Sequence, residues 1–80
     1  MEIKIGSIVR SKAGRDKGML FVAVGLEGGY AYVSDGKLRK VEKPKKKKLK
    51  HLQGTRYFTE SDFSENFRVR DILAEYRKTV

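Results

Sequence analysis

The sequence predicts a mainly β fold, a small barrel that is followed by one C-terminal α-helix. Short runs of β-branched and aromatic residues recur roughly every ten residues up to position 52, and Gly-rich turns separate them. After Gly54 the pattern changes to apolar residues at three- and four-residue spacings, which is typical of an amphipathic helix. The 80 residues are enough for one domain with a modest core. We expect 1–56 to form the barrel and 57–80 the helix packed on it, as a single domain.

The first two predicted strands flank a polar loop. Ile8 and Val9 belong to a strand near 7–11, and the apolar run 19–24 predicts a second one. That run is too short for a typical helix, so we expect a strand with both faces buried. In the loop between the strands, Gly14 and Gly18 suit a positive φ or a close approach of the backbone.

Two further strands are expected after the Gly28-Gly29 turn. Residues 30–33 alternate large and small side chains, which places Tyr30 and Tyr32 on one face of a strand. Asp35-Gly36 is a hairpin-turn dipeptide, and it predicts a returning strand over 37–41. Pro44 marks an edge or loop before a run of lysines. A short final strand is expected around His51.

The C-terminal helix is predicted near 67–78. Asn66 is the expected N-cap, and Arg77-Lys78 suit the last turn. Residues 60–80 carry four bases and five acids. A near-neutral helix is expected to close one end of the barrel and to make no contact with a polyanion.

Positive charge is concentrated in one segment of the chain. The net charge is +9, and residues 40–50 contain seven lysines and one acid. Clustered lysines gain most from a dense polyanion, whose condensed counterions they release on binding. Nucleic acid is therefore the first candidate partner, and a solvated basic loop is the alternative. In both cases we expect the side chains of 45–48 to be solvated.

Several function classes find no support in the sequence. There is no cysteine for a disulfide or a thiolate zinc site, and the single histidine has no evident catalytic partners. No P-loop is present. We therefore expect no enzyme, no catalytic residue, no metal and no cofactor. The N-terminus lacks the apolar region of a signal peptide, and no apolar run approaches membrane-spanning length. A cytoplasmic protein, monomeric in isolation and without a membrane partner, is expected.

The stretch from Gly6 to Gly25 resembles the KOW motif, which consists of a strand, a Gly-centred basic loop and a second strand. The residues that carry the likeness are Val9, Ser11, Ala13, Gly14, Arg15, Asp16, Gly18, Phe21 and Val22. The chain is most similar to large-subunit ribosomal proteins of the fourteen-e family and their small bacterial relatives. Val33, Asp35-Gly36, Arg39, Pro44-Lys45 and His51-Leu52 extend the likeness, which covers about 6–53. The resemblance implies an SH3-like barrel of KOW type whose first loop and adjoining strands contact ribosomal RNA.

The same loop has the chemistry to bind phosphate. Arg15 could contact a phosphate with both arms of its guanidinium, while lysines act as point charges. Asp16, beside Arg15, is expected to be an orienting or turn-stabilising residue, and His51 has either a phosphate-binding or a structural role. The candidate RNA-binding residues are Arg10, Lys12, Gly14, Arg15, Lys17, Lys37, Arg39, Lys43, Lys45, Lys46, Lys47, Lys48, Lys50 and His51.

These observations favour an RNA-binding protein that contacts structured ribosomal RNA as a ribosomal or ribosome-associated protein. Ribosomal proteins are possible further partners. The alternative is an SH3-like protein-interaction module of the transcription or translation machinery, in which the Tyr30 and Tyr32 face is the site. Those two tyrosines would stack on unpaired bases in the first case. A third option is that they pack against the C-terminal helix.

Overall fold

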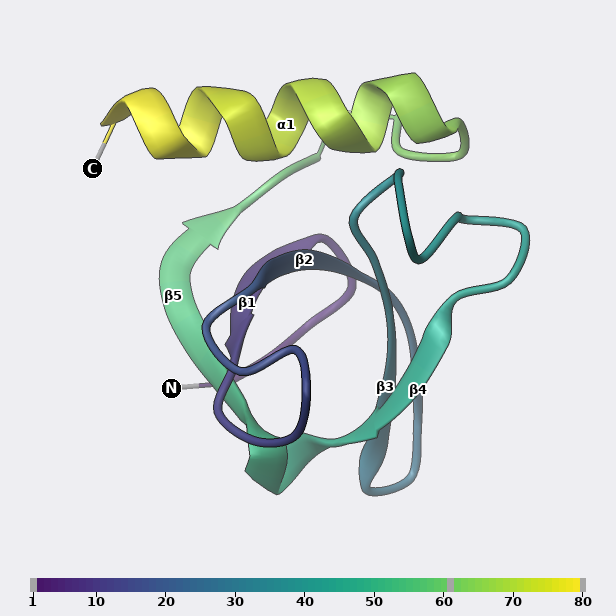
Figure 1. Ribbon diagram of the computed structural model, residues 1–80, viewed down its shortest axis with the longest axis vertical. Coiled ribbons are helices and arrows are strands. Elements are labelled where there is room, and N and C mark those ends of the chain that lie inside the picture. Colours follow the sequence, from purple (N-terminus) through teal and green to yellow (C-terminus); the bar gives the residue numbers. More distant parts are fainter. Residues whose placement is uncertain (1, 61, 80) are drawn as a thin grey trace.

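The computed structural model describes residues 2–60 and 62–79, and it confirms a mainly β fold with one C-terminal helix. The elements are β1 (Ser7–Ser11), β2 (Leu20–Glu27), β3 (Tyr30–Ser34), β4 (Lys45–Lys48), the 3₁₀ turn η1 (Leu49–His51), β5 (Leu52–Phe58) and α1 (Asn66–Thr79). The strands form one antiparallel sheet in the order β4-β3-β2-β1-β5. Figure 1 shows this sheet curling around a common interior, with η1 connecting its two edge strands.

The alternation of side chains along β1 and β2 builds two core clusters, one on each face of the sheet. Val9 and Phe21 point into the curl, where they join Ala31, Val33 and Leu52. Ile8, Leu20 and Val22 point the other way, toward Val69 and Leu73 of α1. The run 19–24 is therefore buried on both faces, as its continuous apolar composition predicts.

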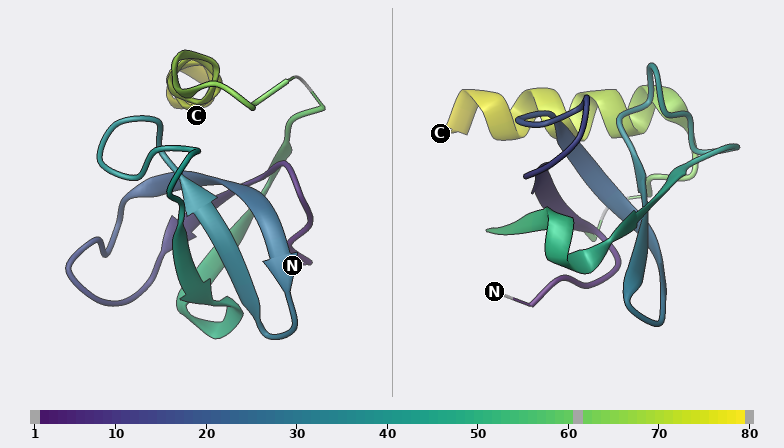
Figure 2. Two further views of the ribbon diagram at one scale, coloured as in Figure 1. Left: turned by 90° about the vertical axis from the view of Figure 1, so that its right-hand side faces the viewer. Right: turned by 60° about the horizontal axis from the view of Figure 1, so that its bottom comes forward.

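The helix covers the outer face of the sheet. The sequence predicts it at one end of the barrel. Figure 2 shows α1 lying across the outside of the strands, and its buried residues Val69 and Leu73 pack on β1 and β2. The predicted range 67–78 is correct to within one residue at each end. The expected N-cap is wrong. Asn66 Oδ1 accepts a hydrogen bond from the Val41 N–H (2.8 Å), and its Nδ2 donates to Glu42 (2.7 Å).

The predicted strand over 37–41 does not form. Asp35 Oδ1 accepts hydrogen bonds from the backbone N–H groups of Lys37 and Arg39, both at 2.9 Å, so Asp35-Gly36 starts a compact loop and no hairpin. The strand that returns along β3 is the lysine run itself. Its register pairs Lys45 with Val33 and Lys48 with Tyr30.

The predicted short strand around His51 is also wrong in its bounds. Residues 49–51 form η1, and the strand that follows is β5, which pairs with β1 from Leu52 to Phe58. The last strand of the sheet therefore ends two residues past 56, the residue at which the sequence predicts the end of the β portion. In the two described stretches, no helix has the length and apolar character that crossing a bilayer requires.

Candidate nucleic-acid interface

The basic loop 12–18 is a closed turn built around Asp16. Gly14 and Gly18 both have positive φ, +85° and +90°, as expected for the Gly positions of this loop. The Gly18 N–H donates to the Ser11 carbonyl (2.8 Å), and the Met19 N–H donates to that of Asp16 (2.9 Å). The Asp16 carboxylate points inward and accepts a hydrogen bond from the Ser11 hydroxyl (2.7 Å). Its expected role as a turn-stabilising residue is therefore confirmed.

A buried ion pair connects this loop to β4, the strand that consists of four lysines. Lys47 Nζ lies 2.7 Å from Asp16 Oδ1 and also donates to Ser11 Oγ (2.8 Å) and to the Ala13 carbonyl (3.1 Å). Lys45 Nζ lies 3.3 Å from the other carboxylate oxygen. Burial by itself raises the pKa of Asp16, but hydrogen bonds from Lys47, Ser11 and Lys45 outweigh it and hold that pKa well below its usual range.

The expectation that all four lysines of 45–48 are solvated is therefore wrong. Strand alternation sets Lys45 and Lys47 on the inner face of β4 with Ala31 and Val33, and Lys47 is only 7% exposed. An ammonium that close to the core needs a partner, and Asp16 provides it. Lys46 and Lys48 lie on the opposite face and are exposed.

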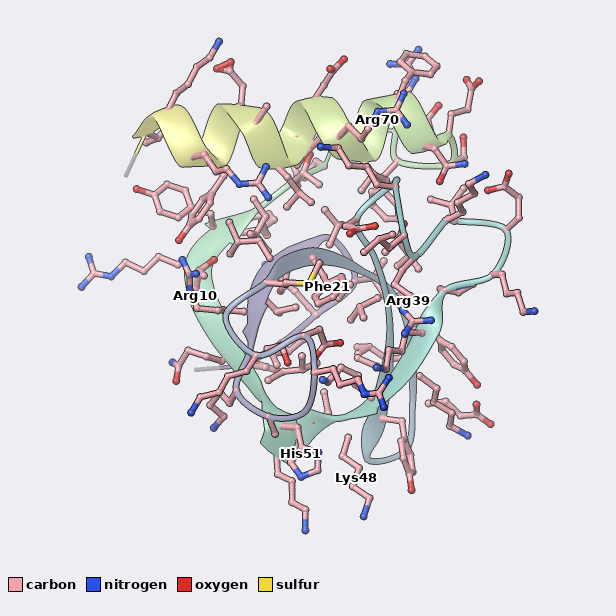
Figure 3. The ribbon with its side chains drawn as sticks, viewed as in Figure 1. Arg10, Phe21, Arg39, Lys48, His51 and Arg70 are labelled. Carbon is pink, nitrogen blue, oxygen red and sulfur yellow. The ribbon has the colours of Figure 1, made fainter. Side chains whose placement is uncertain are left out.

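The loop and β4 together border a shallow hollow of about 330 Å³. Its walls are Ala13 and Gly14 from the loop, Tyr30 from β3, His51 from η1 and the four lysines of β4. The His51 carbonyl accepts a hydrogen bond from the Lys12 N–H (2.8 Å), so Lys12 is held at the same edge. Figure 3 shows Lys48 and His51 side by side at this end of the molecule. We call the surface formed by 12–17, 45–48 and 50–51 the basic surface.

The four remaining predicted residues lie in four different places. Arg39 borders a second hollow with Arg15 and Lys45, directly beside the basic surface. Arg10 is exposed on β1, and its guanidinium donates to the Gly18 carbonyl (2.9 Å), at the end of the loop. Lys37 lies on the helix side, in a hollow that it shares with Arg70 and Arg77. Lys43 is exposed in the turn before β4. Lys37 is therefore separated from the other candidates.

Tyr30 lies closer to the lysines than the sequence indicates. Lys46 Nζ lies 4.6 Å from the centre of the Tyr30 ring and 5.9 Å from that of Tyr32. The register of β4 against β3 produces this contact, because it pairs Lys46 with Tyr32 and Lys48 with Tyr30. Packing of Tyr30 and Tyr32 against the helix was the third option for these residues. The aromatic contact between the sheet and α1 is made by β5 instead, where the ring of Tyr57 meets that of Tyr76 of α1 edge to face, with 5.0 Å between the ring centres.

No protein-family model matches the chain, and no curated protein matches it significantly.

The chemistry available at the basic surface is binding by charge. Nine cations lie in 10–18 and 45–50 together, and Asp16 is the only acid in these two segments. Asp16 is already paired with Lys47 and Lys45. Of the exposed lysines on β4, Lys46 forms an exposed ion pair with Glu27 of β2 at 3.9 Å. In the described part of the chain, no group of three His, Cys, Asp or Glu side chains could hold a metal ion.

Proposed function

We propose that this protein binds structured RNA through its phosphates, and that the RNA is ribosomal. The observation that carries the proposal is the packing of loop 12–18 against β4 by the Asp16–Lys47 ion pair. Two basic segments that lie about 30 residues apart in sequence thereby form one surface, on which Asp16 is the only acid and is buried. The KOW-like sequence of the loop supports ribosomal RNA, and a cytoplasmic ribosomal or ribosome-associated protein is the setting we infer.

Phosphate recognition suits the geometry of the basic surface. Lys12, Arg15, Lys17, Lys46, Lys48 and Lys50 are exposed around it. The Cβ-free backbone at Gly14 leaves room for a phosphate to approach, since an added Cβ would have nothing nearer than 3.8 Å. Side chains of this kind contact the backbone of a folded RNA, and shape rather than base sequence then dominates recognition.

A second candidate function, a protein-interaction module, is favoured by one observation. A hollow of about 490 Å³ lies on the Tyr32 side of the sheet, between β2 and the segment that leads into α1. Val24, Tyr32, Pro44 and Phe63 give it a largely apolar lining. It lies on a different part of the molecule from Gly14 and His51, so the two functions depend on different residues.

The test is a comparison of two variants with the same net charge. Lys46→Gln/Lys48→Gln removes two charges from the basic surface. Lys4→Gln/Lys78→Gln removes two charges elsewhere, near Phe58 and in the last turn of α1. At about 0.1 M salt we expect the first variant to bind ribosomal RNA at least about tenfold more weakly than the wild type. The second variant should stay within about threefold, because long-range charge effects are largely screened at this salt concentration.

Fluorescence anisotropy with a labelled ribosomal RNA fragment measures both affinities. Equal losses in the two variants would mean that net charge alone drives binding and that the basic surface is not the site. If the wild type shows no RNA binding but captures a protein partner in an RNase-resistant manner, the interaction module is the correct function.

A further inference from the structure

The hollow beside the basic surface combines apolar and cationic walls. Its volume is about 430 Å³, within the range of about 300–1,000 Å³ that is typical of ligand sites. Phe21, Met19 and Leu38 supply the apolar part, while Arg15, Arg39 and Lys45 supply the positive charge. Asp16 also lines the hollow, but its carboxylate is paired with Lys45 and Lys47. Figure 3 shows Phe21 inside the curl of the sheet and Arg39 to one side of it, next to β4. A ligand that fits this hollow has both an apolar and an anionic part.

Leu38 is the most exposed of the large apolar side chains in the described residues, at 78%. The loop that carries Leu38 is held in place by hydrogen bonds on both sides of this residue. Besides the two hydrogen bonds to Asp35, the Ser34 hydroxyl donates to the Arg39 carbonyl (2.7 Å). Arg70 of α1 donates to the Gly36 carbonyl (2.8 Å) and ties the loop to the helix. The loop therefore holds an apolar side chain in solvent at the border of a cationic hollow.

The two arginines of the hollow are free to bind an anion. Arg15 and Arg39 are both exposed, and within 2–60 and 62–79 neither guanidinium has an ion pair or a hydrogen bond. Lys45, by contrast, is engaged with Asp16. A guanidinium binds phosphate through a planar pair of N–H groups, so these two residues favour a phosphate over a diffuse negative charge.

We propose that this hollow receives one unpaired nucleotide of the bound RNA, with its base against Leu38 and Met19 and its phosphate on Arg15 and Arg39. This inference rests on the proposed function and narrows its target to RNA with an exposed loop, bulge or end. Bases in a duplex are stacked and turn only their edges outward, so only an unpaired base can lie against an apolar side chain. An acidic peptide has a similar mixture of charge and apolar surface, but the nine cations of the neighbouring segments 10–18 and 45–50 favour RNA, which is the more densely charged polyanion.

The experiment compares a short single-stranded RNA with the same RNA that carries abasic sites, which keep every phosphate and remove bases. We expect the wild type to bind the intact RNA roughly tenfold more tightly, which is about the effect of burying an exposed Leu side chain. Leu38→Ser should bring the ratio of the two affinities close to one. It should leave the affinity for the abasic RNA and its salt dependence unchanged, since no charge is altered.

Leu26→Ser is the matched control, because Leu26 is also exposed (42%) but lies on β2 and does not line the hollow. It should keep the wild-type ratio of the two affinities.

A wild-type ratio of the two affinities near one, or a Leu38→Ser ratio equal to that of the wild type, would overturn the nucleotide site while salt-dependent RNA binding stands. If neither RNA binds the wild type at any salt concentration, the proposed function itself fails. Competition by an acidic peptide that depends on Leu38, together with a ratio near one, would assign the hollow to a protein partner.

Discussion

At the scale of single residues, Asp16 and Lys47 connect the scaffold to the candidate site. The carboxylate accepts hydrogen bonds from Ser11, Lys45 and Lys47, and all of these contacts lie at the end of β1 where the basic loop begins. Both partners of the close pair are largely buried, with side chains that are 10% and 7% exposed. Lys47 is therefore a structural residue within a run whose neighbours face solvent.

The first prediction concerns Lys47. Lys47→Met removes one partner of a buried pair and leaves Asp16 with the longer contact to Lys45 and the hydrogen bond from Ser11, so the free energy of unfolding should fall by about 3 kcal/mol. Lys48→Met, on the exposed face of the same strand, should change it by no more than about 0.5 kcal/mol. Urea denaturation followed by circular dichroism measures both. Similar values for the two variants would show that the ion pair contributes little to stability.

The second prediction is a loss of stability in acid that depends on Asp16. Its pKa is lower in the folded than in the unfolded state, so at acidic pH the unfolded chain binds more protons. The stabilisation is complete above the unfolded pKa and disappears as the pH falls from about 5 toward the folded pKa. Asp16→Asn should therefore flatten the pH dependence of the unfolding free energy below about pH 5. Glu60→Gln, at an exposed position, should keep the wild-type slope.

At the scale of elements, α1 positions the loop that presents Leu38 and Arg39. The loop approaches the helix at Gly36, which has a positive φ of +76°. A Cβ built at this position would overlap the Asn66 carbonyl oxygen and lie 3.0 Å from the Arg70 side chain. The Asn66 side chain holds the same loop at Val41 and Glu42. The first turn of the helix is thus part of the support of the candidate nucleotide site.

The third prediction separates backbone strain from crowding at two glycines. Gly28→Ala should cost about 1 kcal/mol, because φ is +58° there and no atom lies within 4 Å of the added Cβ. Gly36→Ala adds an overlap with the helix backbone, for which we expect a further loss of about 2 kcal/mol. Thermal unfolding of the two variants under identical conditions measures the difference. Equal transition temperatures would contradict the close packing of the loop on α1.

At the scale of the whole molecule, positive charge is concentrated in the middle of the chain, and the C-terminal part is close to neutral. Residues 40–59 carry eight bases and one acid, while 60–80 carry four bases and five acids. In space, α1 covers the outer face of β1 and β2, and the lysines lie on the edge strand β4. Lysines on an edge strand also discourage pairing with another sheet, which is an ordinary reason for their presence. If the proposal is correct, these lysines both prevent pairing with another sheet and attract RNA to this edge of the molecule.

The fourth prediction is the salt dependence of RNA binding. If about five phosphates are neutralised, the affinity should fall by two to three powers of ten between about 50 and 200 mM salt. Lys46→Gln/Lys48→Gln should lower the slope of log affinity against log salt by about 1.4 to 1.8, which corresponds to two phosphate contacts. Anisotropy titrations at four salt concentrations provide the slopes. A wild-type affinity that is independent of salt would exclude binding through phosphates.

Patterns within a few residues were enough to predict β1, β2, β3 and α1. The alternation of Tyr30 to Val33 and the spacing of Val69, Ile72, Leu73 and Tyr76 reflect which side of an element is buried, and this is a local property of the chain. The positive φ of Gly14 and Gly18 follows from the same kind of local requirement. The clustering of basic residues in 40–50 was likewise visible without a structure.

Only the tertiary structure decided which lysines face solvent and where the lysine strand pairs. A run of identical residues has no alternation, so its inner and outer faces are set by the register with β3 and by Asp16, 31 residues earlier. The role of Asn66 was also decided by the tertiary structure. Its side chain accepts a hydrogen bond from the N–H of Val41, which lies 25 residues earlier, and does not cap its own helix. These assignments depend on the pairing of distant segments, because a buried charge or amide takes whichever partner the fold brings within hydrogen-bond distance.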